Sequence, residues 1–379
     1  MAKIVLSGYF GFNNAGDEAI LYAMLKTFKK IEPELEITVL THDPEKTQKQ
    51  YAEMGIKVVN RWKIFEVFPA LFRCDLLLSG GGSLFQDVSS RNSPLYYLGI
   101  IFLARLFDKP VMIYAQGIGP LKKKRNRRLT CWILNTVNKI TVRDQESKDD
   151  LIGLGIQQEI FVTADAVLAL NKQQEIEEKT GQEILKRYEI KREEGEKLLG
   201  VYLRPWEKNE YLLPLVEALN AMLERNWKIV FIPMQFPGDI SVAKEAANLL
   251  NNHQGVILRE GYSPEELLSI TKNFDLIVGM RLHSLIMAGV AGVPMVGLSY
   301  DPKVDRFLRQ AGQVALLSVH NLHAHNIVEM LTWADSQRED IIKELEIRMQ
   351  SMYQKAWQTA RIAMSMLENP DSGGEKRES

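Results

Sequence analysis

The sequence predicts an α/β protein with two doubly wound, Rossmann-like domains that face each other across a cleft. Short apolar runs, typical of buried parallel strands, alternate with longer amphipathic stretches in both halves of the chain. The 379 residues exceed what a single hydrophobic core usually organises. Between the two halves, residues 171–197 are rich in Glu, Lys and Gln, which indicates a linker or a solvated helix.

These observations set the expected domain boundaries. We predict an N-terminal α/β domain over residues 1–170, the linker over 171–197 and a C-terminal α/β domain over 198–335. The amphipathic stretch 336–368 predicts a long helix, which is a candidate to pack back on the N-terminal domain. The polar tail 369–379 is expected to be disordered.

Composition narrows the class of protein. Hydrophobic residues make up 46% and charged residues 25%, as in ordinary globular proteins, and the net charge of −1 gives no sign of nucleic-acid binding. No apolar run is long enough to span a bilayer, and the N-terminus resembles a first strand rather than a secretory signal. Cys74 and Cys131 have neither metal-ligand nor redox spacing. We therefore expect a cytoplasmic protein that binds no nucleic acid.

Several candidate residues follow the first predicted strand, 3–7. The loop after it is rich in Gly and Asn, which accept unusual backbone angles, and its Asn14 is a candidate substrate ligand. Asp17 opens the next helix directly after a glycine, a place equally compatible with helix capping and with catalysis. Glu18 is interpreted as a helix-dipole partner. The glycine spacing of this loop does not fit a dinucleotide-binding fingerprint.

Three further features of the first half end or follow strands. Gly81 and Gly82 belong to a glycine triplet after a buried strand, where amides can face a ligand or the chain can simply turn tightly. Arg143 directly follows the strand 139–142, where an anion ligand would lie. The basic run 122–128 is either a solvated helix start or an attraction for phosphates or an anionic bilayer.

The second half places cations after three of its strands. Arg281 and His283 follow the apolar strand 276–279, Lys303 follows the next strand, and Arg204 follows the first strand of this half. In open parallel sheets these strand ends meet at one edge, where ligands bind. The pattern predicts a site for a small, highly charged anion, with a histidine to move a proton. The competing interpretation is a structural ion pair and a solvated loop lysine.

These motifs together resemble the polysaccharide pyruvyl transferase family, above all the cell-surface-anchoring enzymes of Gram-positive bacteria. The resemblance covers roughly residues 3–331, and its specific parts are residues 11–18, 79–87 and 281–284. It implies a two-domain fold like that of the GT-B glycosyltransferases. The N-terminal domain is then expected to hold the acceptor and the C-terminal domain phosphoenolpyruvate.

The resemblance also implies an activity. A pyruvyl group passes from phosphoenolpyruvate to a sugar, which forms a 4,6-linked ketal and releases phosphate, with no cofactor and no metal. In the surface-anchoring members the acceptor is N-acetylmannosamine in a lipid-linked secondary cell wall polymer precursor, and the finished polymer anchors S-layer proteins. A lipid-linked acceptor implies peripheral contact with the cytoplasmic face of the membrane. The acceptor sugar and the oligomeric state stay open.

The chemistry of this reaction suggests roles for individual residues. We hypothesise that His283, or a donor that it orients, protonates the substrate and stabilises the departing phosphate, and Arg281 is a further catalytic candidate. Asp17 is the candidate base, with Asp87 and Asp165 as reserves. The residues that match the phosphoenolpyruvate-binding positions of the family are Arg143, Arg281, Leu282, His283 and Lys303.

Two other classes of protein compete with this interpretation. A nucleotide-sugar glycosyltransferase on the same fold would also use a cationic site, so the fold alone does not decide. A non-catalytic sugar- or anion-binding protein needs neither a histidine among the cations nor an acid on the other domain. Turnover with phosphate release separates the last class from the first two.

Overall fold

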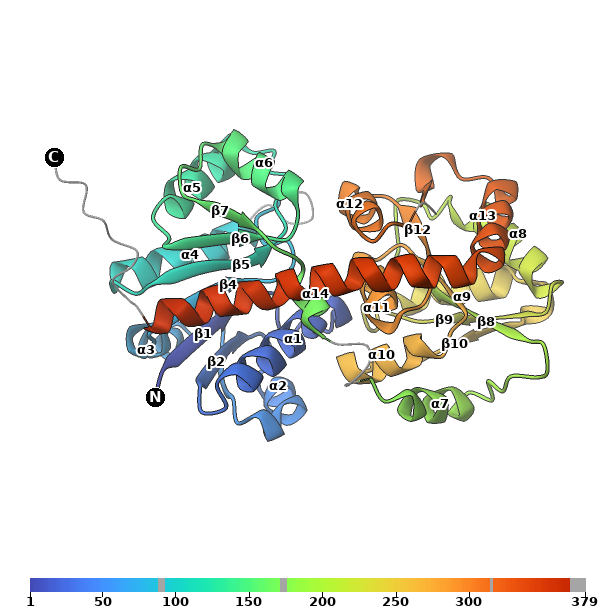
Figure 1. Ribbon diagram of the computed structural model, residues 1–379, viewed down its shortest axis with the longest axis horizontal. Helices are drawn as coiled ribbons and strands as arrows, with labels where there is room; N and C mark the ends of the chain where they lie inside the picture. Colours follow the sequence, from blue (N-terminus) through green and yellow to red (C-terminus); the bar gives the residue numbers. More distant parts are fainter. Residues whose placement is uncertain (88–92, 171–175, 314–315, 369–379) are drawn as a thin grey trace. The chain divides into compact units, whose positions relative to one another are not determined.

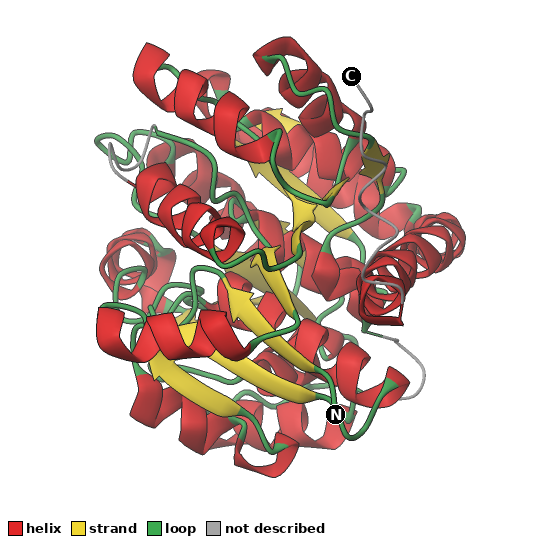
Figure 2. Cartoon of the chain, turned by 90° about the vertical axis from the view of Figure 1, so that its left-hand side faces the viewer, coloured by secondary structure: helices red, strands yellow, loops and turns green. Residues whose placement is uncertain are grey.

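The computed structural model describes residues 1–87, 93–170, 176–313 and 316–368. They form two compact units, each a parallel β-sheet with helices packed around it (Figures 1 and 2). Residues 171–175 of the predicted linker and the predicted disordered tail, 369–379, lie outside the described part. Unit 1 comprises Met1–Phe12, Asp17–Ala169 and Met352–Ser379, and unit 2 comprises Asn13–Gly16 and Leu170–Ser351.

Unit 1 holds a seven-stranded sheet in the order β3-β2-β1-β4-β5-β6-β7, and every neighbouring pair is parallel. Its strands are β1 (Lys3–Ser7), β2 (Glu36–Thr41), β3 (Lys57–Asn60), β4 (Leu76–Gly80), β5 (Val111–Gln116), β6 (Lys139–Val142) and β7 (Ile160–Val162). Its helices are α1 (Ala15–Ile31), which starts in unit 2, α2 (Pro44–Gln50), α3 (Ile64–Arg73), α4 (Ser93–Leu106), α5 (Lys124–Leu134) and α6 (Gln145–Leu154). Short 3₁₀ turns are η1 (Ala52–Met54) and η2 (Ala166–Ala169).

Unit 2 holds a six-stranded parallel sheet in the order β10-β9-β8-β11-β12-β13. Its strands are β8 (Lys197–Tyr202), β9 (Trp227–Phe231), β10 (Gly255–Ile257), β11 (Leu276–Gly279), β12 (Met295–Ser299) and β13 (Leu316–Ser318). Its helices are α7 (Glu178–Arg187), α8 (Leu212–Leu223), α9 (Ile240–Leu249), α10 (Pro264–Lys272), α11 (Leu282–Ala291), α12 (Pro302–Gln310) and α13 (Ala324–Ser336). Here the 3₁₀ turns are η3 (Asn251–His253) and η4 (Val319–Asn321), and α14 (Arg338–Glu368) ends the described chain.

Both sheets have the doubly wound strand order, so the predicted α/β fold class is confirmed. Their central strands are apolar on both faces because helices cover both sides of a parallel sheet, and β4 and β5 are buried along their whole length. In each sheet the winding direction reverses once, between β1 and β4 in unit 1 and between β8 and β11 in unit 2. Ligands of doubly wound sheets bind beyond the carboxyl ends of the strands at that point.

The described part of the predicted linker or solvated helix, residues 176–197, contains a helix that is packed rather than solvated. Its helix α7 buries Gly181, Ile184 and Leu185 within unit 2. The amide of Gly181 donates to Oγ of Ser269 on α10 at 2.6 Å. Glu and Lys occupy only the outward side of this helix. Their number in the sequence obscured the apolar positions that the helix buries.

The long helix α14 carries two sets of contacts. Up to Ser351 it belongs to unit 2, and from Met352 it belongs to unit 1. In the unit 1 part, Ala356 and Ala360 are buried and Trp357 Nε1 donates to the carbonyl of Ala169 at 3.1 Å.

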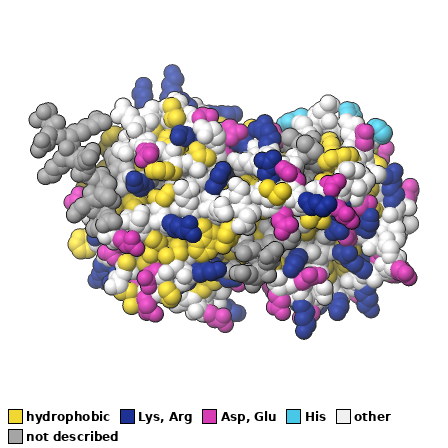
Figure 3. All heavy atoms as spheres, viewed as in Figure 1, with side chains coloured by type: hydrophobic (Ala, Val, Ile, Leu, Met, Phe, Trp, Pro, Cys, Tyr) yellow, Lys and Arg dark blue, Asp and Glu magenta, His cyan; other side chains and the backbone are white. Residues whose placement is uncertain are grey.

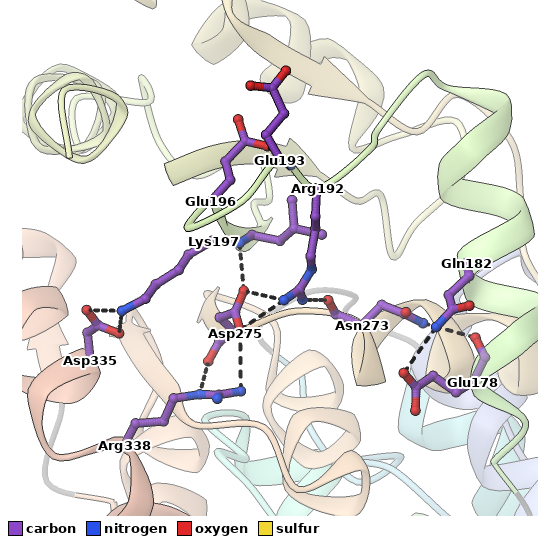
Figure 4. Close-up of polar contacts among 11 residues, drawn as sticks. Glu178, Gln182, Arg192, Glu193, Glu196, Lys197, Asn273, Asp275, Asp335 and Arg338 are labelled. Carbon is purple, nitrogen blue, oxygen red and sulfur yellow. Dashed lines mark hydrogen bonds and ion pairs between the residues drawn. The ribbon is translucent and has the colours of Figure 1, made fainter. Parts of the chain in front are cut away.

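At the amino edge of the unit 2 sheet, a buried carboxylate ties several segments together (Figure 4). Asp275, just before β11, accepts a hydrogen bond from the amide of Leu198 at 2.8 Å. Arg192 lies 3.2 Å and Arg338 lies 3.5 Å from the same carboxylate. Because Arg338 opens α14 and Leu198 belongs to β8, this network fixes the start of two strands and a helix.

The surface of the chain mixes charges of both signs, as Figure 3 shows for the face drawn there. Large exposed hydrophobic side chains are less evenly spread, and many of them lie on α3, α4 and α5 of unit 1. Across the described residues, no helix is both long and apolar enough to cross a membrane.

Candidate functional site

The carboxyl edge of the unit 2 sheet gathers four of the predicted site residues. Arg204 follows β8, Arg281 and His283 follow β11, and Lys303 follows β12. These three strands are neighbours, and the first two flank the reversal point of the sheet. We call Arg204, Arg281, His283 and Lys303 the cationic cluster. Its place in the sheet is the one where a doubly wound domain binds its ligand.

Arg281 is held by a buried acid that the sequence analysis missed. Its Nε lies 2.7 Å from Oδ2 of Asp239, and its Nη2 contacts the other carboxylate oxygen. Asp239 is only 1% exposed and also accepts from the amides of Met234 at 3.1 Å and Gln235 at 2.8 Å. The bidentate pair fixes the guanidinium plane and leaves other N–H donors for a ligand. Leu282, which is buried, opens α11 directly after Arg281, and the first amides of a helix have no partner within the helix.

Arg204 and Lys303 share a tyrosine that the sequence analysis also missed. Arg204 Nη1 donates to the hydroxyl of Tyr300 at 2.7 Å, and its guanidinium carbon lies 4.5 Å from the ring centre. Nζ of Lys303 lies 5.7 Å from the same ring and 3.1 Å from Asp301 Oδ2. Lys303 belongs to the first turn of α12, so the interpretation of a solvated loop lysine is wrong.

His283 packs against the first turn of α1, within unit 2. A Cβ atom on Gly16 would overlap Nδ1 of His283 and lie 2.6 Å from its Cγ, so only glycine fits there. Asn14 Oδ1 accepts from the amide of Gly16 at 3.0 Å, and the amide of Ala15 donates to Met234 at 2.7 Å. The first turn of α1 therefore lies against the imidazole with a fixed backbone. For Asn14 the structure gives this capping role, and its predicted contact with substrate stays a prediction.

Arg143 lies in unit 1, apart from the unit that holds the other four. Its buried guanidinium lies 3.3 Å from Asp165 and 3.5 Å from Asp144, and it donates to Oγ of Ser83 at 3.1 Å. Two carboxylates thus offset one positive charge. Because Asp165 is engaged in this way, it is a weaker candidate for a reserve base.

Asp17 and the glycine triplet lie together at the reversal point of the unit 1 sheet. A Cβ on Gly82 would lie 3.0 Å from Oδ1 of Asp17, and one on Gly81 would overlap the side chain of Ile20 on α1. Both glycines have positive φ angles, +79° and +78°. Close packing and backbone conformation therefore suffice to explain why glycine stands at both positions. That their amides face a ligand stays a prediction.

Glu18 and Asp87 both hold loops, but burial affects them differently. Glu18 is buried and accepts from the amide of Gly11 at 2.8 Å, and burial raises the pKa of this carboxyl to about 7. Glu18 therefore supports the loop rather than only the helix dipole. Burial also opposes the ionisation of Asp87, but bonds from the amides of Lys122 and Lys123 and from Asn126 outweigh it and lower its pKa. Asp87 thus organises the start of α5 and is a poor base.

Aromatic rings line the carboxyl ends of β1, β2 and β3 in unit 1. Tyr9 stacks on Phe12 with ring centres 4.1 Å apart, and Phe12 stacks on His42 at 4.4 Å. Trp62 Nε1 donates to Nδ1 of His42 at 3.0 Å, and the tryptophan is 59% exposed. We call Tyr9, Phe12, His42 and Trp62 the aromatic stack. His42 and Trp62 were not among the predicted site residues, although they lie just beyond the ends of β2 and β3.

Among the described residues, no group of three or more His, Cys, Asp or Glu side chains is arranged so that it could hold a metal ion.

The site residues that the sequence predicts are divided between the two units. Unit 2 holds Arg204, Arg281, Leu282, His283, Lys303 and Asn14, and unit 1 holds Asp17, Gly81, Gly82 and Arg143.

The fold is similar to those of sugar-nucleotide enzymes. One similar structure is a putative UDP-N-acetylglucosamine 2-epimerase from Listeria monocytogenes, with a TM-score of 0.65, 15% identity and 100% of both chains covered. Another is a glycosyltransferase from Rickettsia africae, with a TM-score of 0.67, 12% identity and 98% of this chain and 99% of that chain covered. At such identities the likeness concerns the fold alone, which is GT-B-like.

The sequence comparisons go further than the fold. The profile of the polysaccharide pyruvyl transferase family matches residues 14–302, and the chain belongs to that family. The amylovoran biosynthesis protein AmsJ of Erwinia amylovora is 22% identical over 285 residues, which are 72% of this chain and 68% of AmsJ. The region that matches the family profile includes Arg204, Arg281 and His283 of the cationic cluster and ends one residue before Lys303. The protein is therefore a transferase of the pyruvyl type that acts in polysaccharide synthesis.

Proposed function

We propose that the cationic cluster binds phosphoenolpyruvate and that the protein transfers its pyruvyl group to two hydroxyls of one sugar as a 4,6-linked ketal. The observation that carries this proposal is the gathering of Arg204, Arg281, His283 and Lys303 at the reversal point of the unit 2 sheet. Phosphoenolpyruvate has a carboxylate and a phosphate, and these need several cationic partners. Arginine suits bidentate contact with either group, and lysine supplies a point charge.

Within the cationic cluster, Arg281 and Arg204 differ in conformational freedom. Arg281 is fixed by a buried acid, so it can present its remaining N–H groups in one orientation. Arg204 and Lys303 lie against the ring of Tyr300 and are partly exposed, so a bound anion can displace the Lys303–Asp301 contact at little cost. The amide of Leu282, at the start of α11, adds a neutral donor. In this proposal Arg143 acts from unit 1, where Asp144 and Asp165 already balance its charge.

The chemistry needs one proton delivered to carbon and two removed from hydroxyls. Protonation of C3 of phosphoenolpyruvate makes C2 electrophilic, and a sugar hydroxyl adds to C2 and loses its proton. Phosphate then leaves as the C2–O bond breaks, and the second hydroxyl adds and loses its proton to complete the ketal. In this proposal His283, or a donor that it orients, supplies the first proton and assists the departure of phosphate.

Asp17 is our candidate for the base. It lies at the reversal point of the unit 1 sheet beside Gly82, and it is partly exposed. Asp87 and Asp165 are less suited because amides hold the first and Arg143 holds the second. Replacement of Asp17 by Asn should therefore remove turnover while phosphoenolpyruvate still binds. Turnover within a few-fold of the parent would reject the base assignment.

For the acceptor, the aromatic stack of unit 1 offers ring faces suited to a sugar. The resemblance to the cell-surface-anchoring enzymes favours N-acetylmannosamine in a lipid-linked precursor of a secondary cell wall polymer, which would then serve S-layer anchoring. No cofactor enters this reaction, since phosphoenolpyruvate is a co-substrate.

The test is a phosphate-release assay with phosphoenolpyruvate, with and without a synthetic lipid diphosphate that carries N-acetylmannosamine. Acceptor-dependent release, with the mass gain of a pyruvyl ketal on the acceptor, is the expected result. No release, with a melting temperature still raised by phosphoenolpyruvate, would reject this acceptor but keep the donor. Neither release nor a shift, with a shift by a nucleotide sugar, would favour the glycosyltransferase alternative.

A further inference from the structure

Helices α3, α4 and α5 of unit 1 expose an unusual set of large apolar side chains. Phe65 on α3 is 91% exposed, and other aromatic and aliphatic residues on the three helices are between 42% and 65% exposed. A surface helix normally turns its polar residues outward. We call the following residues the apolar face: Phe65, Phe68, Phe72, Phe102, Leu106 and Trp132.

Helix α3 is apolar on two sides. Val67 and Leu71 point into the core of unit 1, and they satisfy the need for burial. Phe65, Phe68 and Phe72 repeat at a spacing of three and four residues, which places them together on a second, exposed side of the helix. This outward row has no role in the core of unit 1.

The apolar face is continuous across the three helices, which pack side by side (Figure 1). The rings of Phe68 and Phe72 both lie 5.6 Å from the ring of Phe107 at the end of α4. On the other side of α4, Phe102 lies 5.6 Å from Trp132 on α5. Large continuous apolar patches on a protein surface mark contacts with a membrane or another protein.

Positive charge surrounds this face. Residues 63–73, 93–109 and 122–134 contain ten Lys and Arg against two Asp and Glu, whereas the whole chain has a net charge of −1. Arg125 and Arg128 are exposed and share a side of α5 with Trp132, because they precede it by seven and four residues.

We propose that the apolar face and its basic rim bind the surface of a bilayer that contains anionic lipids. Exposed aromatic and aliphatic side chains enter the boundary between headgroups and acyl chains, and Lys and Arg attract anionic headgroups. A second copy of the chain fits less well, because a two-fold contact would bring two basic rims together. This proposal does not depend on the acceptor, since the vesicles that test it contain none.

The experiment is flotation of the full chain with phosphatidylcholine vesicles, with and without phosphatidylglycerol. The parent should float with the anionic vesicles and lose binding at high salt. Phe65→Ser with Phe72→Ser and Leu106→Ser should weaken binding about tenfold or more, since it removes the inserted side chains. Arg125→Gln with Arg128→Gln should reduce the preference for anionic over neutral vesicles.

A matched control removes exposed apolar side chains from unit 2. Leu213 and Ile347 are each 67% exposed, and Leu213→Ser with Ile347→Ser should float like the parent. Melting temperatures near that of the parent establish that each variant is folded. A parent that stays with the dense fraction, or a triple variant that floats like the parent, overturns the proposal. The proposal is also overturned if the parent protein is a dimer in sedimentation velocity and the same three substitutions make it monomeric. The apolar face would then join two copies of the chain.

Discussion

The two edges of the unit 2 sheet use the same pair of groups, arginine and a buried aspartate, in different ways. At the carboxyl edge Asp239 holds one guanidinium, that of Arg281, and its other bonds come from backbone amides. At the amino edge Asp275 lies between two guanidiniums and the amide that starts β8. The first arrangement orients a cation that still has donors for a ligand. The second joins chain segments, so we expect ligand binding at one edge and stability at the other.

The largest effect is expected at the carboxyl edge. Replacement of His283 by Ala should lower kcat by about 10²- to 10⁴-fold, because it removes the proposed proton donor. The melting temperature should change little, since the side chain is only partly buried. The measurement is phosphate release with phosphoenolpyruvate and acceptor at saturation. Normal turnover would remove His283 from the mechanism.

The next effect tests how the imidazole is positioned. In Gly16→Ala the new methyl group would overlap His283, so the start of α1 or the ring must move, and kcat/KM should fall roughly 10²-fold. Gly153→Ala is the matched control, because a Cβ there meets nothing within 4 Å. The control should keep activity and gain about 0.5–1 kcal/mol in stability, since alanine favours a helix. Equal activity in both variants would show that the contact with His283 does not matter.

At the amino edge the effect should appear in stability. Asp275→Asn leaves two guanidiniums without their carboxylate, and it should lower the free energy of unfolding by about 1–3 kcal/mol. The loss is less than for a fully buried pair because both arginines are about half exposed. Urea unfolding measures it, and kcat/KM at low temperature should stay near that of the parent. If Asp275→Asn lost much activity without losing stability, the amino edge would not be the purely structural edge that we describe.

Glu18 of unit 1 shows what a buried acid does without a guanidinium. Its pKa in the folded chain, about 7, lies above the ordinary value of 4.5, so folding takes up a proton between these values. Stability should therefore fall as pH rises from about 4.5 to 7, by up to about 1.4 kcal/mol per pH unit. Glu18→Gln should remove this slope in urea unfolding at pH 5 and pH 8. An unchanged slope would mean that Glu18 is ionised in the folded chain across this range.

The strand framework could be predicted from the sequence, because buried parallel strands leave short apolar runs. The predicted strands 3–7, 139–142 and 276–279 match the structure. Helix α3 was missed because it has only 10 residues and its apolar residues extend from the buried side onto the exposed side. Within 171–197 a helix was one of the two predicted alternatives, but its burial was missed because its charged side dominates the composition.

The cationic cluster was predictable because its members directly follow strands of one sheet. Their partners were not, since Asp239 lies in the turn before α9 and is brought to Arg281 only by the pairing of β8 with β9 and β11. Sequence position alone also does not distinguish Arg143 from Arg281. Both follow strands, but two acids surround Arg143 and one holds Arg281.

The most direct measurement of the central claim is calorimetric binding of phosphoenolpyruvate to three variants and the parent. We expect Arg204→Ala with Lys303→Ala, and separately Arg281→Ala, to raise the Kd at least about tenfold, because each removes charge-assisted contacts. Arg192→Ala, at the amino edge, should bind like the parent. Equal affinity in all four proteins would contradict the assignment of phosphoenolpyruvate to the carboxyl edge of the unit 2 sheet.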